Sequence, residues 1–264
     1  MAPVRQWAEM KAPDFRDVPP DAVAVLPLGA VEQHGPHLPL CVDYQLIEAV
    51  LDRAMPLVDP SVRVLVLPTL RVTKSDEHIR HAGTLSLSAD TLLAVLRDLG
   101  ASVARAGVTR LVLFNGHGGN SALLQVVARD LRLRHGMKAV ACSWSDFAET
   151  QGLFDPEDWA RDLHAGASET SAMLAARPDL VDMSAAPAPD SVIPSWQSTY
   201  RFVGLTGKAV RPGWIIDDLA RSGVVGDARD ADASRGAALL DGSARNFAAF
   251  LKEFSAFEFR GQEG

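Results

Sequence analysis

Four short runs rich in Val, Leu and Ala alternate with longer amphipathic stretches in the first half of this 264-residue chain. Such runs are typical of strands buried on both faces, and the stretches between them have the three-to-four-residue apolar spacing of helices. This alternation predicts an α/β fold in which helices cover both faces of a parallel sheet. The predicted strands are residues 22–27, 62–67, 110–114 and 137–143.

Capping residues mark the boundaries of the predicted helices. Asp43 is placed to cap the first helix, and Gly107 and Gly136 stand where the next two should end. The predicted helices cover residues 44–55, 88–106, 121–134 and 231–254. The chain between Pro187 and the last helix has no comparable pattern. The length favours a single domain over residues 1–264.

The histidines are concentrated where the predicted strands end. Six of the seven lie in four short polar clusters, and three of these clusters also contain a glutamate. Ligands of parallel α/β folds bind beyond the carboxyl ends of the strands, so we expect the clusters to converge on one site. The clusters are Glu32-Gln-His34-Gly-Pro-His37, Glu77-His-Ile-Arg-His81, Asn115-Gly-His117-Gly-Gly-Asn120 and His164-Ala-Gly-Ala-Ser-Glu169.

The residue types in these clusters indicate a metal site. Imidazole and carboxylate groups are the ligands that Zn²⁺, Mn²⁺ and Fe²⁺ prefer. A turn at Gly35-Pro36 would bring Asp43 back beside His34, close to Glu32. The alternative is that Glu32 is a solvated residue at a strand end and that Asp43 only caps a helix. We interpret the chain as a metal-dependent enzyme.

The loop around His117 and the cluster that ends at Glu169 each allow two interpretations. Glycines around His117 let the backbone approach a metal or substrate, and the N–H groups of Gly118 and Gly119 can then face an oxyanion. The alternative is a tight turn with an exposed histidine. His164 and Glu169 lie near another helix start, where Glu169 could instead be a structural first-turn carboxylate.

Composition and charge limit the partners. The net charge of −7 argues against nucleic acid and against an anionic membrane surface. No apolar stretch is long enough to span a bilayer, and the polar N-terminus does not have the pattern of a signal peptide. The two cysteines follow neither a metal-binding nor a disulfide spacing, so we expect a reduced, cytoplasmic protein.

The motifs occur in the order found in a known enzyme family. Besides the four clusters, the chain has Gly29-Ala-Val before the first, Ser75-Asp before the second and Gly83-Thr84 after it. With these landmarks, about residues 20–185 resemble the creatininase (creatinine amidohydrolase) family. The resemblance implies a three-layer α/β/α fold with a mainly parallel central sheet, in a cytoplasmic homo-oligomer that is expected to be a hexamer.

The resemblance also implies two divalent metal ions per subunit, Zn²⁺ or Mn²⁺, with Fe²⁺ compatible with the same ligands. By position, Glu32, Asp43 and His117 would hold one ion. His34 and Asp43 would hold the other, so that Asp43 bridges the two.

Two positions depart from the family pattern. Creatininase has a glutamate ligand two residues after the loop histidine, where this chain has Gly119. Glu169 is therefore expected to complete the metal site, and the change argues against creatinine as the substrate. The family's common Phe-Pro before Gly-Thr is here His81-Ala82, which also indicates an altered pocket.

The expected reaction is hydrolysis of a C–N bond in a small amide, cyclic amide or formamide by hydroxide shared between the two ions. His164 is the candidate proton shuttle, and Glu169 completes the catalytic pair. The candidate substrate-binding residues are Ser75, His78, Gly118 and Gly119.

Two other functions remain open. Some members of the family resemble peptidases that trim a short modified peptide in mycofactocin maturation. The chain could also be a non-catalytic metal-binding or sugar-sensing module, although such a module would not need a proton shuttle and an oxyanion loop in one cleft. Trp144, Trp159 and Trp196 are candidates to wall a small pocket.

Overall fold

The centre of the fold is a five-stranded sheet in which neighbouring strands are parallel. The structure, a computed structural model, describes residues 4–259. The strand order is β1-β3-β2-β4-β5, and the strands are β1 (Val4–Gln6), β2 (Val23–Leu28), β3 (Val64–Val66), β4 (Arg110–Asn115) and β5 (Lys138–Ser143). The predicted parallel sheet is confirmed. The edge strand β1 is additional, because its three residues have no apolar run that would predict it.

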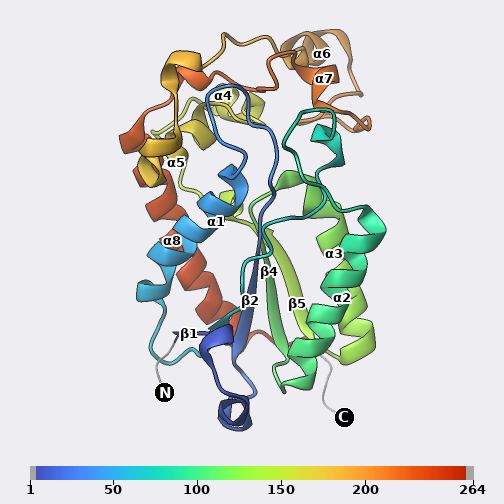
Figure 1. The fold of residues 1–264 in the computed structure, drawn as a ribbon, viewed down its shortest axis with the longest axis vertical. Coiled ribbons are helices and arrows are strands. Elements are labelled where there is room, and N and C mark those ends of the chain that lie inside the picture. Colours follow the sequence, from blue (N-terminus) through green and yellow to red (C-terminus); the bar gives the residue numbers. More distant parts are fainter. Residues whose placement is uncertain (1–3, 260–264) are drawn as a thin grey trace.

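Helices cover both faces of this sheet (Figure 1). Side chains alternate along β2, so that Val23 and Val25 pack into one apolar core and Ala24 and Leu26 into the other. The first core is covered by α1 (Val42–Ala54), α5 (Ala167–Ala176) and α8 (Ala233–Ala256), and the second by α2 (Ala89–Arg105) and α3 (Ser121–His135). The three-layer α/β/α prediction is confirmed. Of the helices within residues 4–259, none has the length and apolar composition needed to cross a bilayer.

Most helix ends fall where the sequence predicts them. The Ser88 side chain caps α2, and Gly136 adopts a left-handed conformation (φ 66°) at the end of α3. The prediction that Asp43 caps the first helix is wrong, because α1 begins at Val42 and Cys41 is its N-cap residue. Asp43 lies instead in the first turn, which leaves its carboxylate available to the site.

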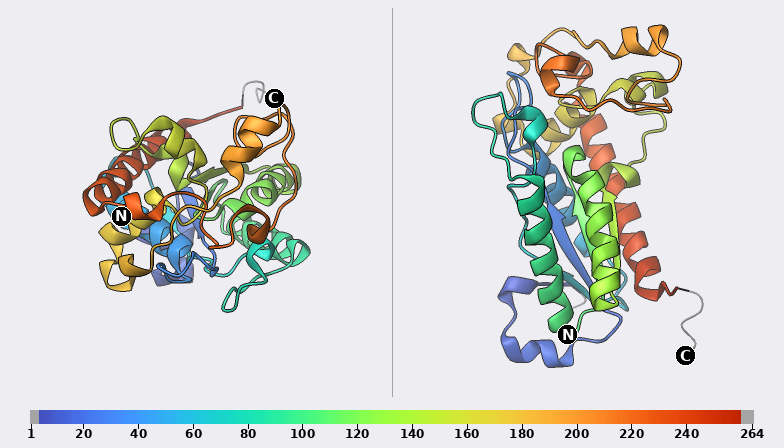
Figure 2. Two further views of the ribbon diagram at one scale, coloured as in Figure 1. Left: turned by 90° about the horizontal axis from the view of Figure 1, so that it is seen from above. Right: turned by 90° about the vertical axis from the view of Figure 1, so that its right-hand side faces the viewer.

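The part of the chain without a clear sequence pattern lies over the carboxyl ends of the strands. Between β5 and α8 the chain forms α4 (Pro156–Arg161), α6 (Ile193–Thr199) and α7 (Ile216–Leu219), which gather at that end (Figures 1 and 2). We call residues 187–226 the roof segment. It has a small apolar core that includes Ile193 and Ile216. Backbone hydrogen bonds between Val225 and His164 join it to the site below.

Candidate metal centre

Five acidic and histidine side chains meet beyond the carboxyl ends of β2 and β4. Two follow β2, one follows β4, and the first turns of α1 and α5 supply one each. Their ligand atoms form two groups that share Asp43, each within 4.8 Å: Glu32, Asp43 and His117, and His34, Asp43 and Glu169; a third group of the same size joins Glu32 and His34 to His164. The structure therefore brings the five predicted ligands together, with Asp43 shared by both groups.

The distances within each of the two groups that share Asp43 are short. In the first, Nδ1 of His117 lies 3.2 Å from Oε2 of Glu32 and 3.5 Å from Oδ2 of Asp43. In the second, Nε2 of His34 lies 3.4 Å from Oδ1 of Asp43 and 3.8 Å from Oε2 of Glu169. The two oxygens of Asp43 thus face different groups, which is the arrangement a bridging carboxylate requires.

Three atoms of this centre are buried without a hydrogen-bond partner: Oε1 of Glu32, Nε2 of His34 and Oδ2 of Asp43. A buried polar atom left unpaired costs about 1–3 kcal/mol. Divalent cations would satisfy these atoms, and a set of imidazole nitrogens and carboxylate oxygens suits Zn²⁺, Mn²⁺ and Fe²⁺. The residues therefore fit a divalent metal site.

Two of the three carboxylates of the centre, those of Asp43 and Glu169, have raised pKa values. Burial, together with the charge of Asp43, raises the pKa of Glu169 to about 7. Burial, together with the charge of Glu32, also raises the pKa of Asp43. Cations reverse such shifts because they stabilise the charged carboxylate. The crowding of negative charge is therefore a second reason for the centre to bind cations.

Hydrogen bonds behind the two histidines fix which ring nitrogen faces the centre. Nδ1 of His34 donates to the backbone carbonyl of Glu32 at 3.1 Å, which leaves Nε2 for the centre. Nε2 of His117 donates to the backbone carbonyl of Lys74 at 2.9 Å, which leaves Nδ1. Partners of this kind orient metal-binding histidines in proteins.

Ser75 holds Glu32 from behind. The sequence predicts that Ser75 binds substrate, whereas the structure places its buried hydroxyl 2.5 Å from Oε2 of Glu32, to which it donates a hydrogen bond. Support of this kind orients a ligand without touching the metal.

Ser75→Ala is expected to weaken metal binding about 10–100-fold, because Glu32 loses the donor that orients it. Competition with a chelator measures the affinity. Ser61→Ala, at an exposed serine, is the control and should bind as the wild type does. An unchanged affinity in Ser75→Ala would show that Glu32 is oriented without the hydroxyl.

A stack of imidazoles lies beside the centre. The ring centroids of His34 and His164 are 4.3 Å apart, as are those of His164 and His78. Nε2 of His164 donates to the backbone carbonyl of Gln33 at 2.8 Å, and the Gln33 side-chain amide donates to Nδ1 of His78 at 2.9 Å. This leaves Nδ1 of His164 facing the centre, 3.7 Å from Oε1 of Glu32.

Burial keeps the imidazoles of His164 and His78 neutral. It lowers the pKa of His78 to about 4, and it lowers that of His164 well below its usual value, helped by the charge of His34. The sequence predicts that His78 contacts substrate, whereas the structure places its Nε2 3.5 Å from Oε1 of Glu32 and its ring edge-on to Trp214 of the roof segment.

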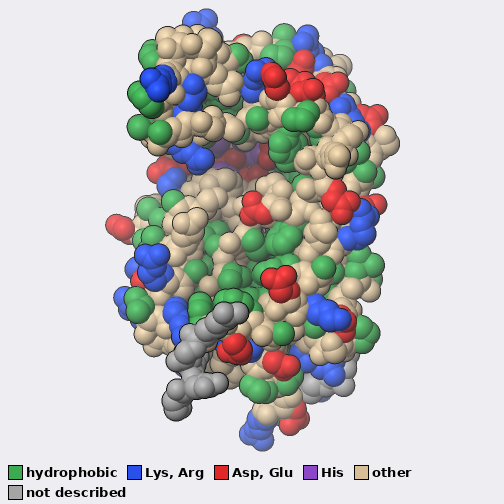
Figure 3. All heavy atoms as spheres, turned by 180° about the vertical axis from the view of Figure 1, so that it is seen from behind, with side chains coloured by type: hydrophobic (Ala, Val, Ile, Leu, Met, Phe, Trp, Pro, Cys, Tyr) green, Lys and Arg blue, Asp and Glu red, His purple; other side chains and the backbone are tan. Residues whose placement is uncertain are grey.

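A cavity of about 450 Å³ opens beside Glu169 and the loop that follows β4. Trp144 and Trp159 line it, and so does Gly118. Trp196 packs instead against the apolar core of the roof segment, so two of the three candidate tryptophans reach this cavity. From behind, the molecule has a hollow beneath the roof segment in which histidine and acidic side chains are visible (Figure 3).

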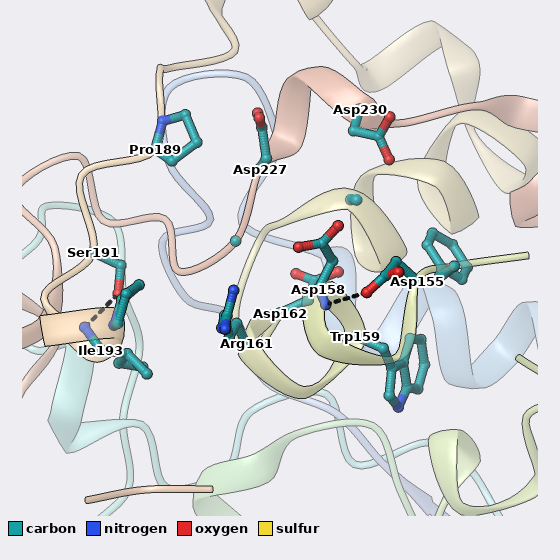
Figure 4. A pocket seen from close by; sticks show the side chains of 14 residues that line it. Asp155, Asp158, Trp159, Arg161, Asp162, Pro189, Ser191, Ile193, Asp227 and Asp230 are labelled. Carbon is teal, nitrogen blue, oxygen red and sulfur yellow. Dashed lines mark hydrogen bonds between the residues drawn. The ribbon is translucent and has the colours of Figure 1, made fainter. Parts of the chain in front are cut away.

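Figure 4 shows a second cavity, of about 580 Å³. It adjoins the first, because Trp159 and Asp162 line both. Aspartates dominate its polar lining, and some of them already have partners. Asp227 pairs with Arg229, and Asp155 caps α4. The two cavities together offer more room than a small amide needs.

Sequence reasoning misses several residues that support the centre. Gln33 and Glu77 lie inside predicted clusters, but their partners come from distant parts of the chain. Thr206 lines the first cavity from the roof segment, where the sequence carries no signal. His81, which lies in a predicted cluster, pairs with Asp217 at 3.0 Å instead of joining the five ligands.

Comparison with known proteins finds relatives along most of the chain. The family model Creatininase, described as creatinine amidohydrolase, matches residues 8–251. Creatinine amidohydrolase from Pseudomonas putida is 38% identical over 194 residues, which cover 67% of this chain and 72% of that protein. A mycofactocin precursor peptide peptidase from Mycobacterium tuberculosis is 31% identical over 240 residues, which cover 87% of this chain and 86% of that protein.

Solved structures have the same fold. A putative creatinine amidohydrolase from Bacteroides fragilis superimposes with a TM-score of 0.79 at 24% identity, over 98% of this chain and 99% of that chain. A mutant creatininase of Zn–Zn type gives a TM-score of 0.71 at 28% identity, over 96% and 98%. A mutant creatininase complexed with creatine gives 0.73 at 28% identity, over 96% and 99%.

Proposed function

Because this chain belongs to the creatininase family of hydrolases, we propose that it is a metal-dependent amidohydrolase that cleaves a C–N bond in a small amide, cyclic amide or formamide. One observation carries the proposal: three buried atoms without partners, on Glu32, His34 and Asp43, belong to ligand groups whose fifth member, Glu169, lines a cavity. A module that only binds metal would not need that cavity, and a module that only senses a sugar would not need the ligand groups beside it.

We propose two divalent ions per chain. Glu32, Asp43 and His117 would hold one, and His34, Asp43 and Glu169 the other. Similarity to a creatininase of Zn–Zn type supports Zn²⁺, and Mn²⁺ and Fe²⁺ suit the same ligands. When bound, such ions polarise a carbonyl and lower the pKa of water.

The side chains around the centre have distinct proposed roles. Nδ1 of His164 would take a proton from the attacking water and give it to the leaving nitrogen. The C–N bond breaks as the nitrogen receives that proton. The products are an amine and a carboxylic acid, which stay on one molecule when the substrate is a cyclic amide. The backbone N–H of Gly118 would stabilise the oxyanion of the tetrahedral intermediate. Trp144 and Trp159 would enclose the substrate.

A second candidate function is cleavage of a short peptide. It is supported by the similarity to the mycofactocin precursor peptide peptidase and by the second cavity that adjoins the first at Trp159. The first cavity, at about 450 Å³, is within the usual range for small-molecule sites, and this favours the small amide.

Metal content is the first test. The wild type is expected to hold about two ions per chain and Glu169→Ala about one, because Glu169 belongs to only one of the two ligand groups. Elemental analysis of the purified proteins measures this. Glu253→Ala, at an exposed glutamate on α8, is the control. Two ions in Glu169→Ala would make Glu169 structural, and no ion in the wild type after reconstitution would refute the hydrolase.

The substrate class is tested on the metal-loaded protein. Creatinine, other cyclic amides, formamides and short peptides are incubated separately, and mass spectrometry identifies the products. Cleavage of small amides alone supports the proposal, and cleavage of peptides alone supports the second candidate. Failure on all of them with both ions bound would refute the proposed reaction.

A further inference from the structure

Glu77 lies directly behind the metal ligand His117. It belongs to the short 3-10 turn Asp76–His78, and its side chain is only 10% exposed. Its Oε1 lies 3.3 Å from Nε2 of His117, and its Oε2 accepts a hydrogen bond from the Lys74 ammonium at 3.0 Å. The carboxylate is therefore held between a lysine and the outer nitrogen of the imidazole.

Two residues of the segment 74–77 contact Nε2 of His117. The backbone carbonyl of Lys74 accepts the Nε2–H of His117 at 2.9 Å, and the Glu77 carboxylate lies beside the same N–H. Both contacts favour a proton on Nε2, which leaves the lone pair of Nδ1 for the centre. A carboxylate behind a metal-binding imidazole also makes that imidazole a stronger ligand.

Glu77 also occupies space next to Gly119. A Cβ at position 119 would overlap Oε1 of Glu77 and Nε2 of His117. The φ angle of Gly119 is not in the left-handed region, so glycine is required here for space and not for backbone conformation.

We propose that Glu77 is a positioning residue, which holds His117 with Nδ1 toward Glu32 and Asp43 and fills the space that Gly119 leaves free. This explains why a glycine stands where creatininase has a ligand glutamate, since a side chain there would displace Glu77 or His117. The inference rests on the proposed function only in taking His117 as a metal ligand.

Zn²⁺ affinity tests the positioning role, measured by competition with a chromophoric chelator. Glu77→Ala is expected to weaken one of the two Zn²⁺ sites about 10–100-fold. Glu77→Gln, whose amide oxygen can still lie against the Nε2–H, is expected to recover most of that loss. Asp76→Ala is the matched control, because Asp76 also pairs with Lys74, is exposed and does not contact His117. Unchanged affinity in Glu77→Ala, or an equal loss in Asp76→Ala, would overturn the proposal.

Thermal unfolding of the metal-free protein tests the steric part. Gly119→Ala is expected to lower Tm by about 5 °C in the wild type, because the added Cβ overpacks the site. In the Glu77→Ala background the same change should lower Tm less, because only the overlap with His117 remains. Equal costs in both backgrounds would overturn this part. Since this measurement needs no metal, it stands even if the hydrolase proposal fails.

Discussion

Asp43→Asn is expected to remove both metal ions and to lower turnover about a thousandfold or more. Asp43 is the one residue common to the two ligand groups, and its two oxygens face different histidines. An amide has one oxygen and no charge, so it can neither bridge two cations nor compensate their charge. Elemental analysis and steady-state kinetics on the substrate found in the panel above measure the two effects.

The folding stability of the metal-free protein is a second measurement on Asp43→Asn, and here the substitution should do no harm. Burial and the charge of Glu32 raise the pKa of Asp43, so near neutral pH its ionised form costs folding free energy in the metal-free protein. Metal-free Asp43→Asn should therefore be at least as stable as the metal-free wild type. Only the wild type should gain from added Zn²⁺, by about 2.7 kcal/mol for each site at which the free ion is at a hundred times the Kd.

Asp52→Asn is the matched control for Asp43→Asn. It makes the same change on the same helix, α1, at an exposed position away from the ligands. Its metal content and turnover should equal those of the wild type. If Asp43→Asn keeps both ions, the bridging arrangement is wrong, whatever happens to the rate.

The sequence predicts the elements that position the ligands, because local rules determine them. Apolar runs predicted β2 and β4, and the clusters that follow these strands supply three of the five ligands. Capping rules predicted the ends of α2 and α3, at Gly107 and Gly136. The same rules wrongly predicted that Asp43 caps α1. An aspartate near a helix start satisfies the capping pattern whether it caps the helix or points into a site.

The supporting contacts could not be predicted from local rules, because they join distant parts of the chain. Gln33 contacts His164 across 131 residues, and Glu77 reaches a histidine on another loop. The roof segment has a small apolar core and short helices, so no periodic pattern marks it in the sequence. Which nitrogen of His117 faces the centre depends on a carbonyl of Lys74, and residue types alone cannot show this.

His164→Gln is expected to lower kcat by about 10²–10⁴-fold while both metal ions stay bound. Nε2 of His164 donates to the Gln33 carbonyl, and the amide N–H of a glutamine can replace that donor. Glutamine cannot carry a proton from water to the leaving nitrogen. The loss should therefore appear in kcat, with metal content and Zn²⁺ affinity unchanged.

Metal content decides between the two roles open to His164. Its ligand atom also lies within 4.8 Å of those of Glu32 and His34, so the geometry allows it to act as a ligand instead. Loss of an ion in His164→Gln would establish that role and leave the proton shuttle unassigned. His81→Gln is the matched control, since His81 lies in a histidine cluster of the sequence but pairs with Asp217 away from the centre. It should change neither kcat nor metal content, because sequence proximity to the ligands has no effect without contact with the reacting atoms.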